Sequence, residues 1–508
     1  MADDSKDKAG ATGTGRTKSG NQAPRNTSRK ISDGSGRGRP RVEARISVEE
    51  LRAAYHKQLS LGSDTDTDKQ TLFDPMEKCR SVLGVARGET GVLWDDRMAE
   101  PHCLWDDDYP ECPARYTSVI NRCQELGLLN RCTRVSPRVA TTQEITKLHS
   151  ERLHQLITST AGVTDADWLE DISAGYNSIY IHPKTSEMAE LAAGGTVAMV
   201  EAVVTGTVHN GMAIVRPPGH HAMHDTLCGY CYYNNVAIAA RHALDNLGVN
   251  RILIVDWDVH HGQGTQQMFY GDDRVMYLSA HRYQHGAYWP ELRESDFDHV
   301  GEGAGLGYNC NVALNATGLG NLEYLSIWTQ LLLPLAYQFC PDLVLVSAGY
   351  DSAVGCPEGL MRITPAFYGH MTSMLMPLAG GKLVVALEGG YCLDSLAEGA
   401  ALTLRTLMGD PCPILVDPLH GEPHPSLSES VLNTITVLRG KWRSLQYQGT
   451  YTDAAAAAAS TVVDNDTPAA AAAAAAAAPI ATTPDTHAVA ADGPAVAADA
   501  PAVAADAP

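Results

Sequence analysis

The sequence predicts an α/β protein whose single large domain has a mainly parallel sheet with helices on both faces. Between residues 88 and 447, short apolar runs rich in β-branched residues alternate with longer segments of helical periodicity, which is the pattern of such sheets. This region is about 360 residues long, enough for one large hydrophobic core. The two ends of the chain lack the pattern, and we expect them to be disordered tails.

Five apolar runs are predicted to be buried strands, because strands that are covered on both faces are apolar throughout. These strands are expected at 212–215, 252–255, 275–279, 343–347 and 383–387. The segments between them have apolar residues at helical spacing. The expected helices are 186–205, 235–247, 321–338, 364–379 and 393–408. Strands that alternate with helices in this way favour parallel pairing.

The first 87 residues are predicted to form a disordered basic arm. Residues 1–50 carry 11 Lys and Arg against 7 Asp and Glu, although the whole chain has a formal net charge of -21. A short helix is expected over 47–60, where Ser47 and Glu50 have the spacing of a capping box. The acidic remainder of the chain argues against general nucleic-acid binding by the folded domain.

Both predicted tails have a distinctive composition. In the arm, the segment from Arg37 to Arg41 resembles an AT-hook, which fits the minor groove of A·T-rich DNA and suggests a weak DNA contact. A nuclear-import signal, a methylation site and a solvated linker are alternatives for the same segment. At the other end, residues 448–508 are rich in Ala and Pro and are predicted to be a solvated tail of low complexity.

The 12 cysteines are scattered through apolar segments rather than arrayed as a disulfide framework, which indicates a reducing, intracellular compartment. Cys228 and Cys231 form a CxxC pair that is expected to open a helix. A structural role is favoured there over zinc or redox use, since no second pair accompanies it. No apolar run has the length of a membrane span, so we expect no membrane contact.

Polar clusters follow four of the predicted strands, at the edge where the ligand sites of parallel sheets lie. They are Arg216-Pro-Pro-Gly-His220-His221, Asp256-Trp-Asp258-Val-His260-His261, Ala-Gly-Tyr350-Asp351 and Glu388-Gly-Gly-Tyr391. Since the carboxyl ends of parallel strands share one edge of the sheet, we expect these clusters to line a single pocket.

The second and third clusters contain a candidate metal site. Asp258 and His260 alternate along a segment that is expected to be extended, so both side chains would project from the same side. Asp351 would complete an Asp-His-Asp set with open positions for water and substrate, as in a catalytic zinc site. Zinc bound there would lower the pKa of a water molecule and polarise a carbonyl group.

The other two clusters supply candidate proton donors and acceptors. A histidine pair by itself also fits a structural role, but beside a metal site His220 and His221 would provide one proton acceptor and one proton donor. Tyr391 follows a Gly-Gly turn that lets the backbone approach closely, and its hydroxyl would donate a hydrogen bond to a developing oxyanion. Together the four clusters predict metal-assisted amide hydrolysis.

These segments resemble those of a known family. RPPGHH, DWDVHHGQGTQ, SAGYD and LEGGY are similar, in the same order, to the signature segments of class II histone deacetylases, and the resemblance extends over about 90–445. HCLWDD (102–107) and HRYQHGAYWP (281–290) resemble the class IIb branch, in particular the first catalytic domain of the tandem-domain tubulin deacetylase. The resemblance implies the fold shared by arginases and deacetylases, and a zinc-dependent deacetylase.

Two ion sites follow from the resemblance. It implies that Asp258, His260 and Asp351 bind zinc, in agreement with the reasoning from the residues themselves. It also implies a monovalent cation, potassium, near the backbone and carboxylate of Asp256 and near Ser279.

Catalytic roles follow in the same way. His221 would be the general base and acid, and His220 would be its electrostatic partner, held by Asp256. Tyr391 would polarise the substrate carbonyl; the weakly active class IIa branch has His at that place. Gln263 stands where class I enzymes have Asp, and a neutral amide should leave His221 less readily protonated.

The resemblance also implies a substrate channel. Tyr230 and Trp289 match the two aromatic positions that wall an acetyl-lysine channel, with Gly229 beside them, although Phe is commoner at the first position. An aromatic slot accepts a thin apolar stem and excludes bulkier side chains. Core packing is the alternative for these aromatic residues. His261 has no assigned role and is expected to be structural.

Glu358 bears on the choice of substrate, because it follows the predicted metal ligand Asp351 by seven residues, at the expected mouth of the pocket. In the polyamine deacetylase of the class IIb branch, a Glu at the matching place selects a cationic acetylated polyamine. That enzyme also narrows its pocket with a short insertion, whereas residues 105–116 here have the shorter spacing of protein deacetylases.

The sequence therefore favours hydrolysis of N6-acetyl-lysine in histones or other proteins, with acetylpolyamine hydrolysis as the alternative. We accordingly expect the protein to regulate chromatin and transcription, and to be located in the nucleus and cytoplasm. A catalytically silent scaffold that binds acetylated tails is a third hypothesis, which the intact ligand set and Tyr391 disfavour.

Overall fold

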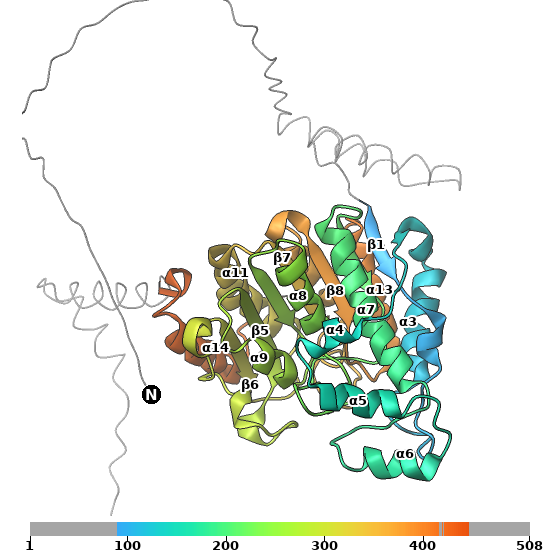
Figure 1. The fold of residues 1–508 in the computed structure, drawn as a ribbon. Helices are drawn as coiled ribbons and strands as arrows, with labels where there is room; N and C mark the ends of the chain where they lie inside the picture. Colours follow the sequence, from blue (N-terminus) through green and yellow to red (C-terminus); the bar gives the residue numbers. More distant parts are fainter. Residues whose placement is uncertain (1–88, 416–418, 420, 447–508) are drawn as a thin grey trace, which may run out of the picture. The chain divides into compact units, whose positions relative to one another are not determined.

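Within the described residues, eight strands form one sheet, and every neighbouring pair is parallel. The strands are β1 (Thr90–Leu93), β2 (Thr133–Arg134), β3 (Asn210–Ala213), β4 (Ile252–Asp256), β5 (Val275–Arg282), β6 (Asn309–Leu314), β7 (Leu343–Ala348) and β8 (Leu383–Leu387). Their order across the sheet is β2-β1-β3-β8-β7-β4-β5-β6. The predicted parallel α/β architecture is confirmed, and it is drawn in Figure 1.

The computed structural model describes residues 89–415, 419 and 421–446. The predicted arm with its helix over 47–60, the segment from Arg37 to Arg41 and the predicted tail 448–508 lie outside the described residues.

The five predicted strands are present because their apolar runs are buried on both faces, and every residue of β4 and β7 is buried. The first of them was placed too late, since β3 begins at Asn210 and pairs with β1 from its first residue. Strands β1, β2 and β6 were not predicted. β6 contains the buried polar residues Asn309 and Asn311, and β2 has two residues, so neither has a long apolar run.

Helices cover both faces of the sheet. On one face α7 (Thr185–Val204) packs beside α8 (Asn235–Asn246), and on the other α13 (Leu393–Leu407) packs beside α3 (Pro113–Glu125) and α12 (Pro365–Leu375) (Figure 1). The other α-helices of the described residues are α4 (Thr142–Thr146), α5 (Glu151–Ser159), α6 (Ala166–Ser173), α9 (Gln263–Phe269), α10 (Asn321–Ile327), α11 (Leu333–Phe339) and α14 (Pro425–Leu438). Among the described helices, none combines the length and apolar character needed to cross a bilayer.

The continuous helix predicted over 321–338 is interrupted. A π-helical turn, Trp328–Leu332, separates α10 from α11. Pro334 lies in the first turn of α11 and has no backbone N–H to donate to the preceding turn. A π-helical turn accommodates such a break without ending the helical course of the chain.

The packing of α7 depends on a close approach of backbones at Gly194. A Cβ atom at this position would lie 2.2 Å from the carbonyl oxygen of Arg138 and 2.3 Å from the amide nitrogen of Ala140. Both of these are backbone atoms of the segment that crosses the helix. The contact therefore leaves no room for a side chain.

We predict that Gly194→Ala lowers the free energy of unfolding by about 2–4 kcal/mol, because backbone atoms cannot yield as a flexible side chain does. Chemical denaturation measures this loss. The control is Gly440→Ala, where an added Cβ meets no atom within 4 Å. An equal loss in both variants would contradict the close-contact explanation.

Candidate active site

The four polar clusters lie together because they follow four strands that are neighbours in the sheet, β3, β8, β7 and β4. All four strands run in the same direction, so their carboxyl ends share one edge. The side chains brought together there are buried, as are the strands that carry them: His220, His221, Asp256, Asp258, His260, Asp351 and Glu388. The site is therefore built on the rigid centre of the sheet.

Asp258, His260 and Asp351 form one cluster, whose ligand atoms lie within 4.8 Å of one another. The Nδ1 atom of His260 is 3.1 Å from Oδ1 of Asp258 and 3.3 Å from Oδ2 of Asp351. The segment after β4 was expected to be extended, but residues 258–260 form a bend. The amide of His260 donates to Oδ1 of Asp258 at 2.9 Å, so the chain curls and still brings both side chains to one side.

This cluster fits a divalent cation such as zinc. Asp351 keeps Oδ2 buried without a hydrogen-bond partner, although Oδ1 accepts the amide of Val259 at 2.7 Å. Burial, together with the carboxylate of Asp258, raises the pKa of Asp351 to about 6. Two adjacent buried carboxylates are repulsive unless a cation lies between them. A mixed set of two carboxylates and one imidazole is a zinc ligand set.

Glycines bring the backbone against this cluster. A Cβ at position 349 would lie 2.0 Å from Oδ2 of Asp258, and one at position 389 would lie 2.3 Å from Oδ2 of Asp351. The amide of Gly389 also donates to Oδ2 of Asp258 at 3.0 Å. The carboxylates are thus fixed from the side of β7 and β8.

The two histidines of the first cluster have different partners. Nδ1 of His220 lies 3.0 Å from Oδ2 of Asp256, and Nδ1 of His221 lies 2.7 Å from Oε1 of Gln263. Burial opposes the charged form of His220, but the carboxylates of Asp258 and Asp256 raise its pKa to about 10. Burial and the neighbouring His220 lower the pKa of His221 well below its usual value. The pair therefore combines a cation with a neutral imidazole.

A buried ion network that the sequence analysis missed supports Tyr391. Arg115 donates to the carbonyl of Gly390 at 2.7 Å, and its guanidinium lies 4.9 Å from the centre of the Tyr391 ring. Glu111 bonds to Arg115 at 2.9 Å and to Arg216 at 2.6 Å. The sequence offered one signal for this network. Glu111 and Arg115 are four residues apart around the start of α3, a helix that packs on the core, where a charged residue needs a partner.

Glu388 is a second residue that the sequence analysis quoted without giving it a role. Its Oε2 atom accepts the amides of Gly219 at 2.7 Å and His220 at 3.2 Å. Burial raises the pKa of Glu388 to about 7. This carboxyl group joins the end of β8 to the turn that carries the histidine pair.

A cavity of about 210 Å³ borders the cluster of Asp258, His260 and Asp351, whose His260 forms part of the cavity wall. Its lining includes every residue predicted for the substrate channel, and consists of Ser178, His221, Gly229, Tyr230, His260, Tyr288, Trp289, Glu358 and Tyr391. At Gly229, a Cβ would lie 2.5 Å from both the Trp289 ring and the His221 ring. Glycine at this position therefore allows the rings of Trp289 and His221 to pack against the backbone in the cavity wall.

The CxxC pair does not open a helix. Gly229 and Tyr230 have φ values of 53° and 64°, and the amides and carbonyls of Cys228 and Cys231 are paired across them. This geometry is a tight two-residue turn. Asn234 then caps α8, which begins four residues after the second cysteine. The turn presents Tyr230 to the cavity.

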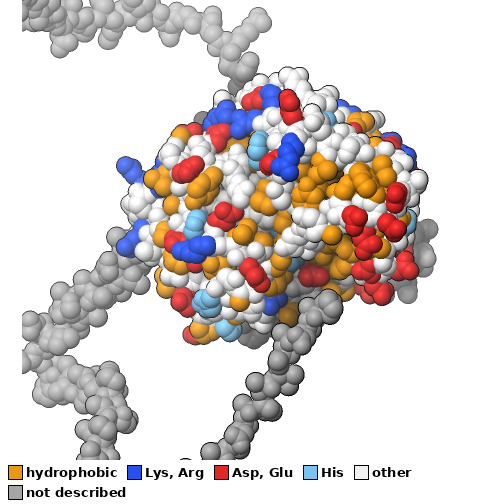
Figure 2. All heavy atoms as spheres, turned by 60° about the horizontal axis from the view of Figure 1, so that its bottom comes forward, with side chains coloured by type: hydrophobic (Ala, Val, Ile, Leu, Met, Phe, Trp, Pro, Cys, Tyr) orange, Lys and Arg blue, Asp and Glu red, His pale blue; other side chains and the backbone are white. Residues whose placement is uncertain are grey.

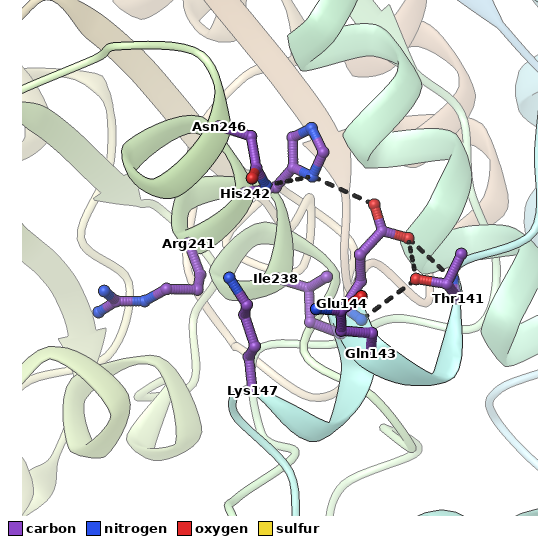
Figure 3. A pocket seen from close by; sticks show the side chains of 8 residues that line it. All are labelled: Thr141, Gln143, Glu144, Lys147, Ile238, Arg241, His242 and Asn246. Atoms are coloured by element: carbon purple, nitrogen blue, oxygen red, sulfur yellow. Dashed lines mark hydrogen bonds and ion pairs between the residues drawn. The ribbon is translucent and has the colours of Figure 1, made fainter.

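A second hollow, of about 250 Å³, lies between α4 and α8. Figure 3 shows that Glu144 and His242 face each other across it. Its charges are neutralised locally, since Lys147 pairs with Asp245 at 2.5 Å and Nε2 of His242 lies 3.0 Å from Glu201. The side chains that line it form no chemically reactive cluster comparable with that of the first cavity.

Two further predicted positions lie next to the site. Ser279 is the register partner of Asp256, and its hydroxyl is 2.8 Å from Nδ1 of His281. The potassium site near these residues stays a prediction. His261 is buried, with Ser295 at 2.8 Å from Nδ1 and Gln266 at 2.9 Å from Nε2. These contacts agree with a structural role.

The fold and the site define a class of α/β protein with a buried Asp-His-Asp cluster at the carboxyl edge of a parallel sheet, beside a histidine pair. The sequence profile of the histone deacetylase domain matches residues 109–407. The chain therefore belongs to the histone deacetylase family.

Individual relatives agree with this assignment. Polyamine deacetylase HDAC10 of Homo sapiens is 47% identical over 363 residues, which cover 71% of this chain and 54% of the relative. Histone deacetylase HDA1 of Saccharomyces cerevisiae is 37% identical over 75% of this chain and 56% of its own. Histone deacetylase 5 of Arabidopsis thaliana is 38% identical over 72% of this chain and 55% of its own. The chain thus spans about half the length of the curated relatives it matches.

We predict that Gln263→Glu raises the pKa of His221 by about 1–3, because a carboxylate beside Nδ1 stabilises the imidazolium that burial disfavours. The imidazolium form would then persist to higher pH. NMR titration of the histidine ring resonances measures the change. Gln267→Glu makes the same chemical change at an exposed position of α9, and there the pKa of His221 should stay as in the wild type. An unchanged pKa in Gln263→Glu would contradict the assigned contact.

Proposed function

We propose that the chain hydrolyses the amide bond of N-acetylated amines. The observation that carries this proposal is the Asp258, His260 and Asp351 cluster, which borders an aromatic-walled cavity through His260. Tyr391 lines the same cavity. These three side chains would hold zinc. The named activities of the relatives, polyamine deacetylase and histone deacetylase, are of the same chemical kind.

The side chains of this site divide the chemistry among them. A bound zinc ion would polarise the acetyl carbonyl and make the attacking water more acidic. His221, which is neutral and donates Nδ1–H to Gln263, keeps the lone pair of Nε2 free to take the proton of that water. His220 remains a cation held by Asp256 and favours negative charge in the transition state.

Tyr391 would stabilise the oxyanion that forms on the acetyl group. Burial raises the pKa of its phenol well above the usual value, so the hydroxyl keeps the proton that it must donate. Arg115 fixes the turn before it by bonding to the carbonyl of Gly390. Donors that are held in place before reaction require no reorganisation during it.

The substrate class depends on the mouth of the cavity. The short spacing of residues 105–116 favours acetyl-lysine in proteins. Glu358 is the one carboxylate among the side chains that line the cavity in the described residues. A second amino group on the substrate would be attracted to it, whereas an acetyl-lysine side chain has no charge there. We therefore give acetylpolyamines precedence and keep protein acetyl-lysine as the second candidate.

The surroundings of the cavity support a cationic substrate. Asp106, Asp107 and Asp108 are exposed on the segment that also carries Tyr109, and the Tyr109 ring packs edge-on against Tyr230, with centroids 5.5 Å apart. Figure 2 shows Asp and Glu side chains gathered on one side of the face that lies at the bottom of Figure 1. Such a surface raises the local concentration of cations.

We predict that Asp258→Ala loses bound zinc and reduces kcat by about 1,000-fold or more, because both the ligand and the partner of His220 disappear. Elemental analysis after dialysis and a deacetylation assay measure the two effects. Chelation of the wild type should abolish activity, and added zinc should restore it. Glu429→Ala, which removes an exposed carboxylate of α14 that does not line the cavity, is the control. Full activity in Asp258→Ala would contradict the proposal.

We predict that Glu358→Leu lowers kcat/KM for N8-acetylspermidine at least about tenfold, equal to about 1.4 kcal/mol of lost attraction. The rate with an acetyl-lysine peptide should stay the same or rise. Side-by-side assays with the zinc-loaded protein measure both. Glu125→Leu removes an exposed carboxylate of α3 that does not line the cavity, and serves as the control. Equal losses with both substrates would contradict the role of Glu358 in selecting cations.

A further inference from the structure

Tyr288 contacts the candidate metal ligand His260 directly. Its hydroxyl lies 3.0 Å from Nε2 of His260, and the two rings are stacked, with centroids 5.4 Å apart and an interplanar angle of 11°. The same hydroxyl donates to the backbone carbonyl of Glu358 at 2.8 Å. No sequence pattern predicted a role for Tyr288.

The number of hydrogens fixes the direction of these bonds. A phenol has one hydrogen to donate, and a backbone carbonyl can only accept. The hydroxyl hydrogen of Tyr288 therefore points to Glu358, and its oxygen accepts a hydrogen from Nε2 of His260. Nδ1 of His260 faces the carboxylates of Asp258 and Asp351, which only accept, so without a metal it carries a hydrogen as well. A bound metal ion would take the place of that hydrogen, and the hydrogen on Nε2 would stay with Tyr288.

The ring of Tyr288 is itself held in place. The guanidinium of Arg282, at the end of β5, lies 4.1 Å from the centre of the ring. Arg282 also donates to the carbonyls of Glu358 at 3.2 Å and Gly359 at 3.1 Å. These contacts fix the phenol and the segment to which it bonds as one unit. The hydroxyl therefore cannot turn away from His260 without breaking several contacts.

We propose that Tyr288 is a positioning residue for the metal centre, whose hydroxyl holds His260 in the tautomer and orientation that present Nδ1 to zinc. This inference rests on the proposed function, because it takes His260 as a metal ligand. Hydrogen-bond partners behind a ligating histidine contribute to metal affinity in general. Here the partner also ties the metal ligand to Glu358, the residue proposed to select the substrate.

The test is the zinc affinity of Tyr288→Phe, which keeps the ring and removes only the hydroxyl. Competition with a chromophoric chelator should show the Kd for Zn²⁺ rising about tenfold or more. The matched control is Tyr233→Phe, which removes a hydroxyl 2.8 Å from Nδ1 of His154, a histidine outside the cluster. Its Kd should equal that of the wild type.

A second measurement uses Co²⁺ in place of zinc, because its visible absorption reports the geometry of the ligands. The spectrum should change in Tyr288→Phe and coincide with the wild type in Tyr233→Phe. Equal Zn²⁺ affinities or coincident spectra in Tyr288→Phe and the wild type would overturn this inference alone. A wild-type chain that binds no zinc, or an Asp258→Ala variant that binds it as tightly, would instead overturn the proposed function.

Discussion

The repulsion between two buried carboxylates, those of Asp258 and Asp351, is the constraint on which the rest of the site depends. Neither group can be solvated by water in the interior, so each needs donors or cations close by. The amides of Gly389 and Val259 supply hydrogen bonds, and His220 supplies positive charge. These groups do not fully compensate the negative charge of the two carboxylates, and a bound cation would do so. The fold thus creates the conditions for metal binding before any metal is present.

A second layer of buried charge keeps the reacting groups in place. Glu111 joins Arg115 to Arg216, and Arg115 bonds to the turn that carries Tyr391. Breaking a pair of this kind would leave an uncompensated buried charge, at a cost of several kcal/mol. The position of Tyr391 therefore depends on buried residues that are distant from it in the sequence. In our proposal the bond between the Tyr288 hydroxyl and His260 fixes the metal ligand in the same manner.

Chemistry and selectivity come from different parts of the fold. The candidate metal ligands and the histidine pair follow the central strands of the sheet, whereas Tyr230, Trp289 and Glu358 lie on loops or tight turns. Strand ends hold side chains more rigidly than loops do, and loops tolerate changes of length and charge. In our proposal the sheet therefore sets the chemistry, whereas one carboxylate on a loop, that of Glu358, selects the substrate.

The sequence by itself determined the parallel architecture and the location of the site. Strands that are apolar throughout must be buried on both faces of the sheet. The polar clusters that follow them lie at the same edge, because parallel strands end there. The tertiary structure alone decided which groups touch. Arg115 reaches a carbonyl 275 residues away, and Tyr288 reaches a histidine 28 residues away. No local periodicity records such contacts, because they arise from the packing of whole elements rather than from neighbouring residues.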